Sequence, residues 1–376
     1  MFYRILAIVK KELKQVVRDK RTLGILVVIP AFMIIMFGYA LNFDVKHTSL
    51  ALYDEDKSNE SRAFAQSFLH SEYFDFKYVV KSKDEIDNLL GKEECRVVVV
   101  IPGDFSHHLK GGESAPIQVI VDGANSNAAT TAIGYIMAIV QDYSTTIVIQ
   151  SLRHTGRAGT SMPIDYRPRV WFNPELRSAK FLVPGLIAFI LMVTAVISTS
   201  LSVVREKEKN TLEQIIVSRA KPLEFIVGKT IPFMMISFAA TIIILIVSFI
   251  LFDIVVKGSL LLLLALTLIF LAGSLGQGLL ISTVAETQQV AFMLAVILTM
   301  LPTFLLSGFV FPIRNMPFAI QVITYLIPSR YFLVVLRSII LKGVGIGAFY
   351  NEVLFLIAFA IVAIGVSLAR MKKQSW

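Results

Sequence analysis

The sequence is poor in the residues that build redox, metal and covalent catalytic sites. It contains one cysteine, Cys95, so no disulfide can form within the chain. Cys95 precedes the strand-like run RVVVV, a setting typical of a packed thiol rather than a reactive one. The five histidines lie between residues 47 and 154 without the HxxxH or CxxC spacing of a metal site. Local spacing therefore predicts no metal site, no bound cofactor and no catalytic residue in this chain.

A complete nucleotide-binding loop is also missing. Gly228, Lys229 and Thr230 match the end of a Walker A motif, but Leu223 stands where that motif has its first glycine. These residues also open an apolar segment, whereas a Walker A motif follows a strand. We interpret Lys229 as a lysine at a membrane boundary and predict that this polypeptide hydrolyses no nucleotide.

Long apolar runs dominate what is present. The chain is 55% hydrophobic, with a mean hydropathy of +0.70. Its apolar runs match the ~20 residues that cross a bilayer core. We therefore predict an α-helical polytopic membrane protein of about six transmembrane helices, the first at residues 23–41 and the other five within residues 181–369. Those five are expected at about 181–204, 231–252, 259–283, 290–311 and 353–368.

The distribution of positive charge predicts the orientation in the membrane. Lysine and arginine crowd residues 1–22, the loop at residues 205–230 and the tail at residues 370–376. The positive-inside rule places all three, and hence both termini, in the cytoplasm. The net charge of +9 therefore requires no nucleic acid as partner. The predicted location is a bacterial inner membrane.

Two polar segments have recognisable patterns. Residues 1–22 combine apolar positions at helical spacing with a basic face, which predicts an amphipathic helix on the cytoplasmic membrane surface. Residues 42–180 alternate strand-like and helix-like stretches, which predicts an inserted α/β domain on the outer, periplasmic side. The expected strands are TSLALYD, RVVVVIP and PIQVIVDG; the expected helices are SRAFAQSFLH, KDEIDNLLG, GDFSHHLKG and residues 125–153.

Residues 312–343 are apolar but interrupted by prolines and arginines. A full crossing here would place the basic C-terminal tail outside, so a re-entrant hairpin on the outer face fits better. The residues that mark this segment are Pro312, Pro317, Pro328 and Arg330. Within the spans, Pro184, Gly185, Pro302, Ser307 and Gly308 indicate kinks or close helix contacts. Ordinary packing and a role in a transport pathway both remain open for them.

The middle portions of the predicted spans contain essentially no Asp, Glu, Lys, Arg or His. Carriers driven by protons or sodium generally place ionisable residues or broken helices near the midplane. Energy for uphill transport would therefore enter through the cytoplasmic loop. In that loop Asn210 is expected to cap a short helix, with Glu213 completing a capping box.

Six stretches spread along nearly the whole chain carry a family resemblance. They are DEDKSNESRAF, VDGANSNAA, VWFNPELRSAKFLVPG, REKEKNTLEQIIVSRAKPLEFIVGK, LLSGFVFPIRNMP and IPSRYF. The sequence resembles membrane subunits of ABC transporters of the type-2 exporter class, and more narrowly bacterial multidrug-efflux permeases with a large periplasmic domain. The loop is the most specific stretch, with Arg-Glu, Thr-x-Glu-Gln and a Glu before Gly-Lys. Relatives often have a glycine before the threonine, where this chain has Lys209 and Asn210.

The resemblance implies a dimer, with a second copy or a paralogue, that exports hydrophobic or amphipathic drug-like compounds by alternating access. Separate nucleotide-binding ATPase subunits would hold ATP and Mg and dock on the N-terminal helix and the loop. The expected coupling residues are Arg205, Glu206, Glu208, Thr211, Glu213, Gln214 and Glu224. The second and fifth spans would line the pathway, and the hairpin would form an outer gate. The expected pathway and gate residues are Pro184, Gly185, Pro302, Ser307, Gly308, Pro312, Pro317, Pro328 and Arg330. A periplasmic membrane-fusion adaptor and an outer-membrane channel are further expected partners.

Two alternatives stay open. The first is a permease of the same class that exports a lipid or a glycan, because a hydrophobic composition cannot separate these substrates from drugs. The second is a membrane sensor or scaffold that transports nothing and acts through its outer domain. That reading predicts a cytoplasmic signalling domain or few membrane helices, whereas this sequence has about six spans and little cytoplasmic mass.

Overall fold

The chain forms two compact units, one helical and one α/β. The computed structural model describes residues 2–40, 48–69, 71, 73–124, 126–154, 172–173, 177–211 and 221–375. The helical unit comprises Met1–Asn42 and Val170–Trp376, and the α/β unit comprises Phe43–Arg169. The predicted fold class, a helical polytopic protein with an inserted α/β domain, is confirmed.

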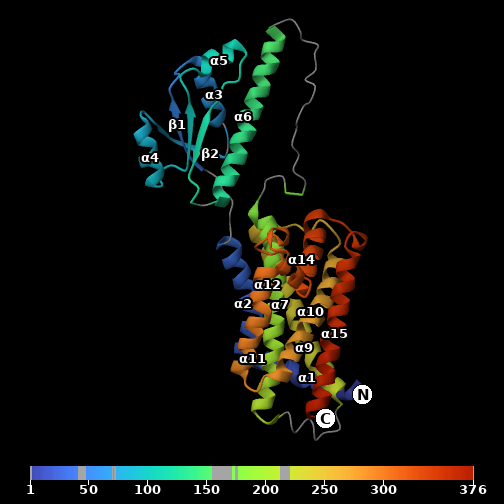
Figure 1. Ribbon diagram of the computed structural model, residues 1–376. Coiled ribbons are helices and arrows are strands. Elements are labelled where there is room, and N and C mark those ends of the chain that lie inside the picture. The colour runs from blue at the N-terminus through green and yellow to red at the C-terminus, as the bar shows by residue number, and fades with distance from the viewer. Residues whose placement is uncertain are drawn as a thin grey trace. The chain divides into compact units, whose positions relative to one another are not determined.

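The α/β unit is built on a four-stranded sheet (Figure 1). Its strands are β1 (Thr48–Asp54), β2 (Phe74–Val79), β3 (Val97–Ile101) and β4 (Gln118–Val121), in the order β2-β1-β3-β4. β1 runs parallel to both β2 and β3, and β4 runs antiparallel to β3. Every residue of β3 is buried, as expected for a β-branched run covered on both faces of a sheet.

Helices cover both faces of this sheet. One face packs against α3 (Asn59–Leu69), α5 (Phe105–Gly111) and α6 (Ser126–His154), and the other against α4 (Lys83–Gly91). The predicted helices and the strands β1, β3 and β4 are confirmed. β2 was missed, because only its first residue, Phe74, is buried. Its remaining residues are exposed and include two charges, so the segment carries no clear strand pattern.

Six helices among the described residues are long and apolar enough to cross a membrane. Five belong to the predicted second to sixth spans, and the sixth is residues Ala128–Ile149 of α6. Yet Ala132 and Ile136 of α6 pack into the core of the α/β unit, so we assign this helix to that unit. The first predicted span corresponds to α2 (Lys20–Ala40), whose described apolar part is the shorter stretch Leu26–Ala40.

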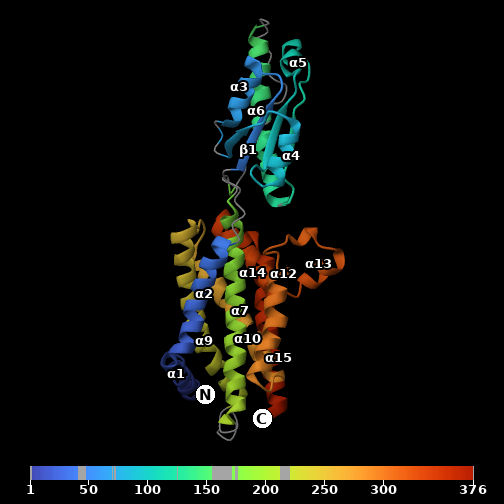
Figure 2. The same cartoon turned by 90° about the vertical axis from the view of Figure 1, so that its left-hand side faces the viewer.

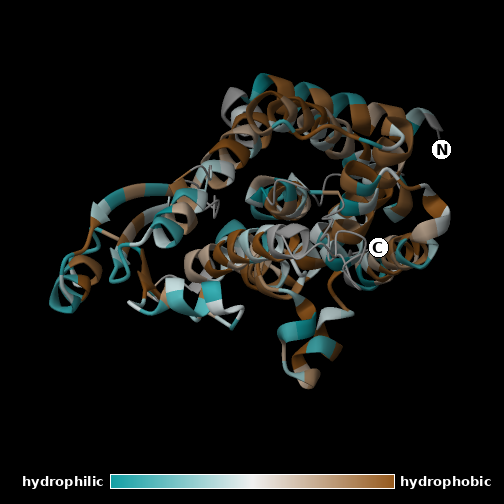
Figure 3. Ribbon diagram, turned by 90° about the horizontal axis from the view of Figure 1, so that it is seen from above, coloured by the Kyte–Doolittle hydropathy of each residue, from teal (hydrophilic) through white to brown (hydrophobic). Residues whose placement is uncertain are grey.

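The helical unit is arranged around α7 (Ser178–Glu208). Around it lie α1 (Phe2–Arg18), α2, α9 (Pro222–Phe252), α10 (Leu260–Val284) and α11 (Gln288–Ala295). α11 continues through the π-helical turn η1 (Val296–Met300) into α12 (Leu301–Leu306), and α15 (Tyr350–Ser375) ends the chain. Apart from α1, these helices are mostly apolar, and brown predominates where the bundle is seen from above in Figure 3.

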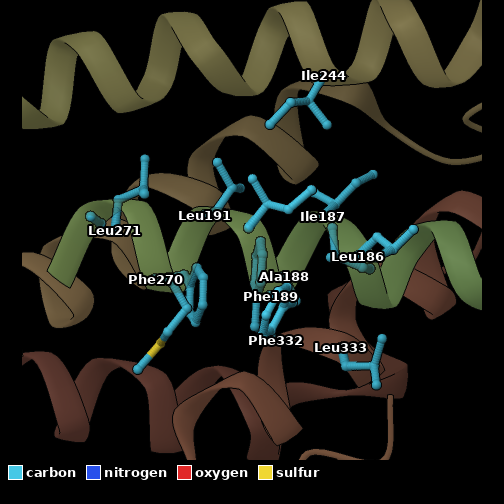
Figure 4. Close-up of a cluster of buried hydrophobic side chains, with 14 of the residues drawn as sticks. Leu186, Ile187, Ala188, Phe189, Leu191, Ile244, Phe270, Leu271, Phe332 and Leu333 are labelled. Atoms are coloured by element: carbon cyan, nitrogen blue, oxygen red, sulfur yellow. The ribbon is translucent and has the colours of Figure 1, made fainter. Parts of the chain in front are cut away.

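Side chains of α7 fill the centre of this unit. Figure 4 shows Ile187, Phe189 and Leu191 of α7 among residues from α9, α10 and α14. Phe270 of α10 and Phe332 of α14 stack with ring centroids 4.0 Å apart. Because α7 packs against α2, α9, α10, α11 and α14, it cannot shift without moving its neighbours.

Between α12 and α15 the chain turns back at one end of the helical unit. This segment contains η2 (Ile313–Asn315), α13 (Phe318–Thr324), α14 (Pro328–Arg337), the π-helical turn η3 (Ser338–Lys342) and η4 (Ile346–Ala348). An 82° bend separates α13 from α14. Figures 1 and 2 place both at the end opposite the two chain termini. We call the end with α13 and α14 the hairpin end, and the end with the two chain termini the terminal end. A chain that turns back at one end supports the interpretation of residues 312–343 as a re-entrant hairpin.

A charged contact at α5 gives the α/β unit a pH-sensitive element. His108 lies 2.9 Å (Nδ1) from Oε2 of Glu113 and 3.1 Å (Nε2) from Oδ2 of Asp104. The hydrogen bond with Glu113, followed by that with Asp104, raises the pKa of His108 above its usual value. The charged imidazole therefore stabilises the turn after α5.

This shift predicts that α5 loses stability as pH rises. A raised pKa in the folded state gives a contribution that is complete below the unfolded value of about 6.5 and is lost as pH rises through the folded pKa. Hydrogen–deuterium exchange of α5, corrected for intrinsic rates, should show less protection at about pH 8.5 than at about pH 5.5. His108→Gln should remove this difference, and His107→Gln should preserve it. A difference that persists in His108→Gln would refute the assignment.

Candidate functional site

At the terminal end, α1 packs closely against the start of α9. The contact is centred on Gly228, where an added Cβ would lie 2.6 Å from Cγ2 of Ile8. On α1, Val9, Glu12 and Val16 are buried, whereas Leu6 and Val17, which belong to the expected apolar stripe, are exposed. The glycine of the Walker-like Gly-Lys-Thr therefore serves a close helix contact, which only a residue without a side chain allows.

The same contact encloses a cluster of four charges from three helices. Lys229 of α9 is 1% exposed, and its Nζ lies 3.0 Å from Oε2 of Glu12 on α1 and 3.1 Å from Oε2 of Glu206 on α7. Nζ also donates a hydrogen bond of 3.0 Å to Ser202 Oγ. Lys11 of α1 completes the cluster by contacting both glutamates. Lys229 is therefore a buried ion-pair partner, and its position at a membrane boundary stays a prediction.

Two ammonium groups and two carboxylates leave this charge cluster with no net charge. Buried charges are tolerated when each one faces an opposite charge. Burial lowers the pKa of Lys11, but the hydrogen bond and charge of Glu206, with those of Glu12, more than offset it and raise the pKa above its usual value. The charge cluster therefore joins α1, α7 and α9 at one point.

A second set of polar contacts joins the end of α7 to α11 and to the junction of α1 and α2. Arg205 lies 3.6 Å from Asp19 and donates through Nε to Oε1 of Gln288 at 3.3 Å. Glu208 accepts a hydrogen bond of 2.7 Å from the backbone N–H of Gln288, the first residue of α11. A carboxylate at this position satisfies a free donor at a helix start. The end of α7 is therefore tied to the fifth span as well.

The chain leaves α7 through a left-handed residue. Asn210 has a φ of 53°, a conformation that asparagine tolerates better than most residues and glycine adopts freely. Asparagine at position 210 therefore fits this left-handed turn. Thr211 Oγ1 donates to the carbonyl of Glu206 at 3.2 Å. Glu213 and Gln214, and with Glu213 the expected capping box, lie outside the described residues.

The first turn of α9 is capped by the side chain of Glu224. Oε2 of Glu224 accepts a hydrogen bond of 2.9 Å from the backbone N–H of Lys221. Glu224 is 1% exposed and lies 3.7 Å from Arg4 of α1. It therefore fixes the first turn of α9 and adds a further link between α9 and α1.

At the hairpin end, one of the expected pathway residues, Gly185, packs directly against an aromatic side chain. An added Cβ on Gly185 of α7 would lie 2.1 Å from the ring of Phe309. Pro184 precedes this glycine, and Ser307 and Gly308 precede Phe309. Phe309 also contacts the rings of Phe189 and Phe304, with centroids 6.1 and 5.8 Å away. This aromatic plug (Phe189, Phe304 and Phe309) fills the space between α7 and the end of α12.

Two further expected pathway residues border a different cavity. Pro302 and Pro328 line a space of about 270 Å³ among α7, α10, α12, α14 and α15. Gln277 lines it too, and its Nε2 donates to Thr299 Oγ1 in η1 at 3.0 Å. A proline removes a backbone donor, and the π-helical turn η1 lies directly before Pro302.

The remaining expected gate residues shape the hairpin segment. Pro312 precedes η2, and Pro317 precedes α13. Arg330 lies 3.9 Å from the ring centroid of Tyr325 and donates to Thr324 Oγ1. It therefore holds α13 and α14 at their bend.

Comparison with known proteins assigns these features to a family. The family model described as ABC-2 family transporter protein matches residues 20–369. The chain belongs to the ABC-2 transporter permeases. It is 35% identical over 373 residues to the probable multidrug ABC transporter permease YbhS of Escherichia coli K12, covering 99% of this chain and 97% of that protein. It is 34% identical over 352 residues to YbhR of the same organism, a protein of the same description, covering 94% of each chain.

A more distant relative has a similar extent. The inner membrane transport permease YhhJ of Escherichia coli K12 is 26% identical over 374 residues, which cover 96% of this chain and 95% of that protein. These matches span both units. The chain is therefore a multi-pass transporter permease, and the two ends of its helical unit belong to a membrane transport subunit.

Several residues of the charge cluster escaped sequence reasoning. Glu12, Lys11 and Lys229 were not among the expected coupling residues, although Glu206 was. The detectable signal was Glu12, an acid at helical spacing with Val9 and Val16 on an otherwise basic helix. Among the expected coupling residues, Glu206 and Glu224 are buried against helices of this chain, whereas Glu208 is exposed.

Removing the ammonium of Lys229 should destabilise the ABC-2 permease strongly. Lys229→Met leaves two buried carboxylates opposite Lys11 alone, and an uncompensated buried charge costs about 3–5 kcal/mol. Thermal unfolding in mild detergent should show a large loss of stability. Adding Glu206→Gln should recover most of it, because the charge cluster becomes neutral again. A double variant less stable than Lys229→Met would argue against the charge balance.

The contact at Gly185 yields a second prediction. Gly185→Ala forces the new methyl group into Phe309, and overpacking of this kind costs about 1–3 kcal/mol. Phe309→Ala removes the obstacle but leaves a cavity, at about 3–5 kcal/mol. The double variant should therefore lose clearly less than the sum of the two in thermal unfolding. Strict additivity would show that the two residues do not share this contact.

Proposed function

We propose that this permease exports amphipathic, drug-like compounds across the bacterial inner membrane, driven by separate ATPase subunits. The observation that carries the proposal is the charge cluster at the terminal end, together with spans whose middle portions hold no ionisable residue. A charge-free interior offers no ion-coupling site, so the driving force enters where charge is concentrated. The printed descriptions of YbhS and YbhR as multidrug permeases support the substrate class.

Alternating access is the proposed mechanism. ATP would close the nucleotide-binding subunits against α1 and the loop at residues 205–230, on the cytoplasmic side. Because Lys229 of α9 binds both Glu12 of α1 and Glu206 of α7, a displacement of α1 moves α9 and α7 with it. Glu206 and Gly185 lie about 31 Å apart along α7, at about 1.5 Å per residue. One buried helix therefore connects the ATP-driven end to the aromatic plug.

A cavity next to the charge cluster supports an amphipathic substrate. It has a volume of about 310 Å³ and lies among α1, α2, α7, α9 and α11. Apolar side chains such as Met33, Ile197 and Phe292 line most of it, and Glu12 and Arg205 border it as well. Such a site suits a ligand with an apolar body and a polar or charged group. Since Glu12 borders the cavity and binds Lys229, ligand binding and coupling would share a residue.

The proposed assembly contains two permeases, as a homodimer or with a paralogue, and two nucleotide-binding subunits that hold ATP and Mg. A membrane-fusion adaptor and an outer-membrane channel are proposed to receive the substrate on the periplasmic side. Exposed apolar residues on α6, among them Met137 and Val148, support contact between the α/β unit and another protein.

The decisive test is co-purification of an active ATPase. Tagged permease extracted in gentle detergent should carry a P-loop ATPase, identified by mass spectrometry, whose activity rises with an amphipathic cationic dye. Glu213→Arg in the family loop should reduce the bound ATPase about tenfold or more, because a reversed interfacial charge pair costs several kcal/mol. Glu286→Arg, a matched reversal in the exposed connection between α10 and α11, should retain it. A well-folded preparation without any ATPase would contradict the proposal.

A further inference from the structure

Arg337, the last residue of α14, links three separate segments at the hairpin end. Its Nη2 donates to the carbonyl of Phe181 in the first turn of α7 at 3.2 Å. Its Nη1 donates to the carbonyl of Gly308, just after α12, at 3.4 Å. The guanidinium carbon also lies 3.9 Å from the centroid of the Phe181 ring. One side chain therefore ties α14 to both segments that enclose Phe309.

This arginine has no carboxylate partner in the part of the chain that the structure describes. Its Nε is buried and donates no hydrogen bond to any of the described residues. Separating a buried ion pair leaves two unpaired charges, which costs much free energy. Separating an arginine from two neutral carbonyls leaves only one, so carbonyls hold the cation less firmly than a carboxylate does. The two contacts of Arg337 are therefore suited to a bond that must form and release repeatedly.

The backbone at Gly308 makes this arrangement possible. Gly308 has a φ of 81°, the left-handed region that glycine adopts without strain. The chain thereby turns directly after α12, and it presents the Gly308 carbonyl to Arg337 while the next residue, Phe309, packs on Gly185. Separation of α7 from Phe309 would increase the distance between the two carbonyls that Arg337 bridges.

We propose that Arg337 is a latch that holds the hairpin end closed by bridging the Phe181 and Gly308 carbonyls over the aromatic plug. The proposal rests on the exporter function, since it takes the hairpin end as the outward gate. Opening breaks both hydrogen bonds and frees the guanidinium for water. Arginine suits this role because its planar fork reaches two acceptors at once, whereas the single ammonium of lysine does not have that geometry. Arg337 is thus a positioning residue for the gate.

The test is the accessibility of a cysteine placed beside the latch. Ser307 is 3% exposed, and Ser307→Cys in a Cys95→Ala background gives a single reporter thiol. In spheroplasts the thiol is labelled with a membrane-impermeant maleimide. Arg337→Gln should raise the labelling rate about tenfold without ATP, since charge-assisted hydrogen bonds are lost. Arg337→Lys should fall between the two, and Arg314→Gln, an exposed arginine of the same hairpin segment, should match the reporter.

The outcomes separate the latch from the exporter mechanism. Equal labelling of Arg337→Gln and the reporter overturns the latch; where Arg337→Gln fails to fold, equal labelling of Arg337→Lys and the reporter overturns it. The exporter mechanism is tested with the reporter variant that keeps Arg337. In inside-out vesicles that enclose the maleimide, ATP and vanadate should raise the labelling rate of its thiol. If Arg337→Gln labels faster but ATP has no effect, the latch stands and the ATP-driven mechanism fails. If ATP raises labelling but Arg337→Gln does not, the reverse holds.

Discussion

The ammonium of Lys229 is the constraint on which the terminal end depends. A lysine that is 1% exposed at a membrane boundary must be matched by carboxylates, and the chain supplies one from α1 and one from α7. Gly228 removes the side chain that would keep α1 too far away for Glu12 to reach. The charge pairing thus dictates where the amphipathic helix lies, and an otherwise peripheral helix becomes part of the bundle.

The consequences reach the other end through α7. Short polar contacts fix its last turns to α1, α9 and α11, while Gly185 near its start is in contact with Phe309. Between these points the helix is surrounded by packed side chains, which deform little. The charge cluster and the aromatic plug are therefore connected by one tightly packed helix. This is a mechanical reason for a permease to bury its second span at the centre.

Sequence reasoning succeeded where the signal was local and failed where it depended on distant contacts. Hydropathy located α7, α9, α10 and α15, and β-branched runs located β1 and β3. The burial of Lys229 could not be read in the same way, because it is set by Glu12 more than 200 residues away in sequence. β2 was missed for a related reason, since an edge strand with exposed side chains takes its identity from its pairing with β1. The role of the expected gate residues stays a prediction, and Phe309 and Arg337, which the structure places beside some of them, carried no local motif.

Composition alone would also count α6 as a membrane span. Residues Ala128–Ile149 are apolar enough to cross a bilayer, yet Ala132 and Ile136 are committed to the core beneath the sheet. A helix that packs on a sheet cannot also be a separate span, so tertiary contacts overrule hydropathy. The exposed part of α6 then remains apolar, with Met137 and Val148 uncovered within the α/β unit. An exposed apolar stretch of this kind is typical of a surface that another molecule covers.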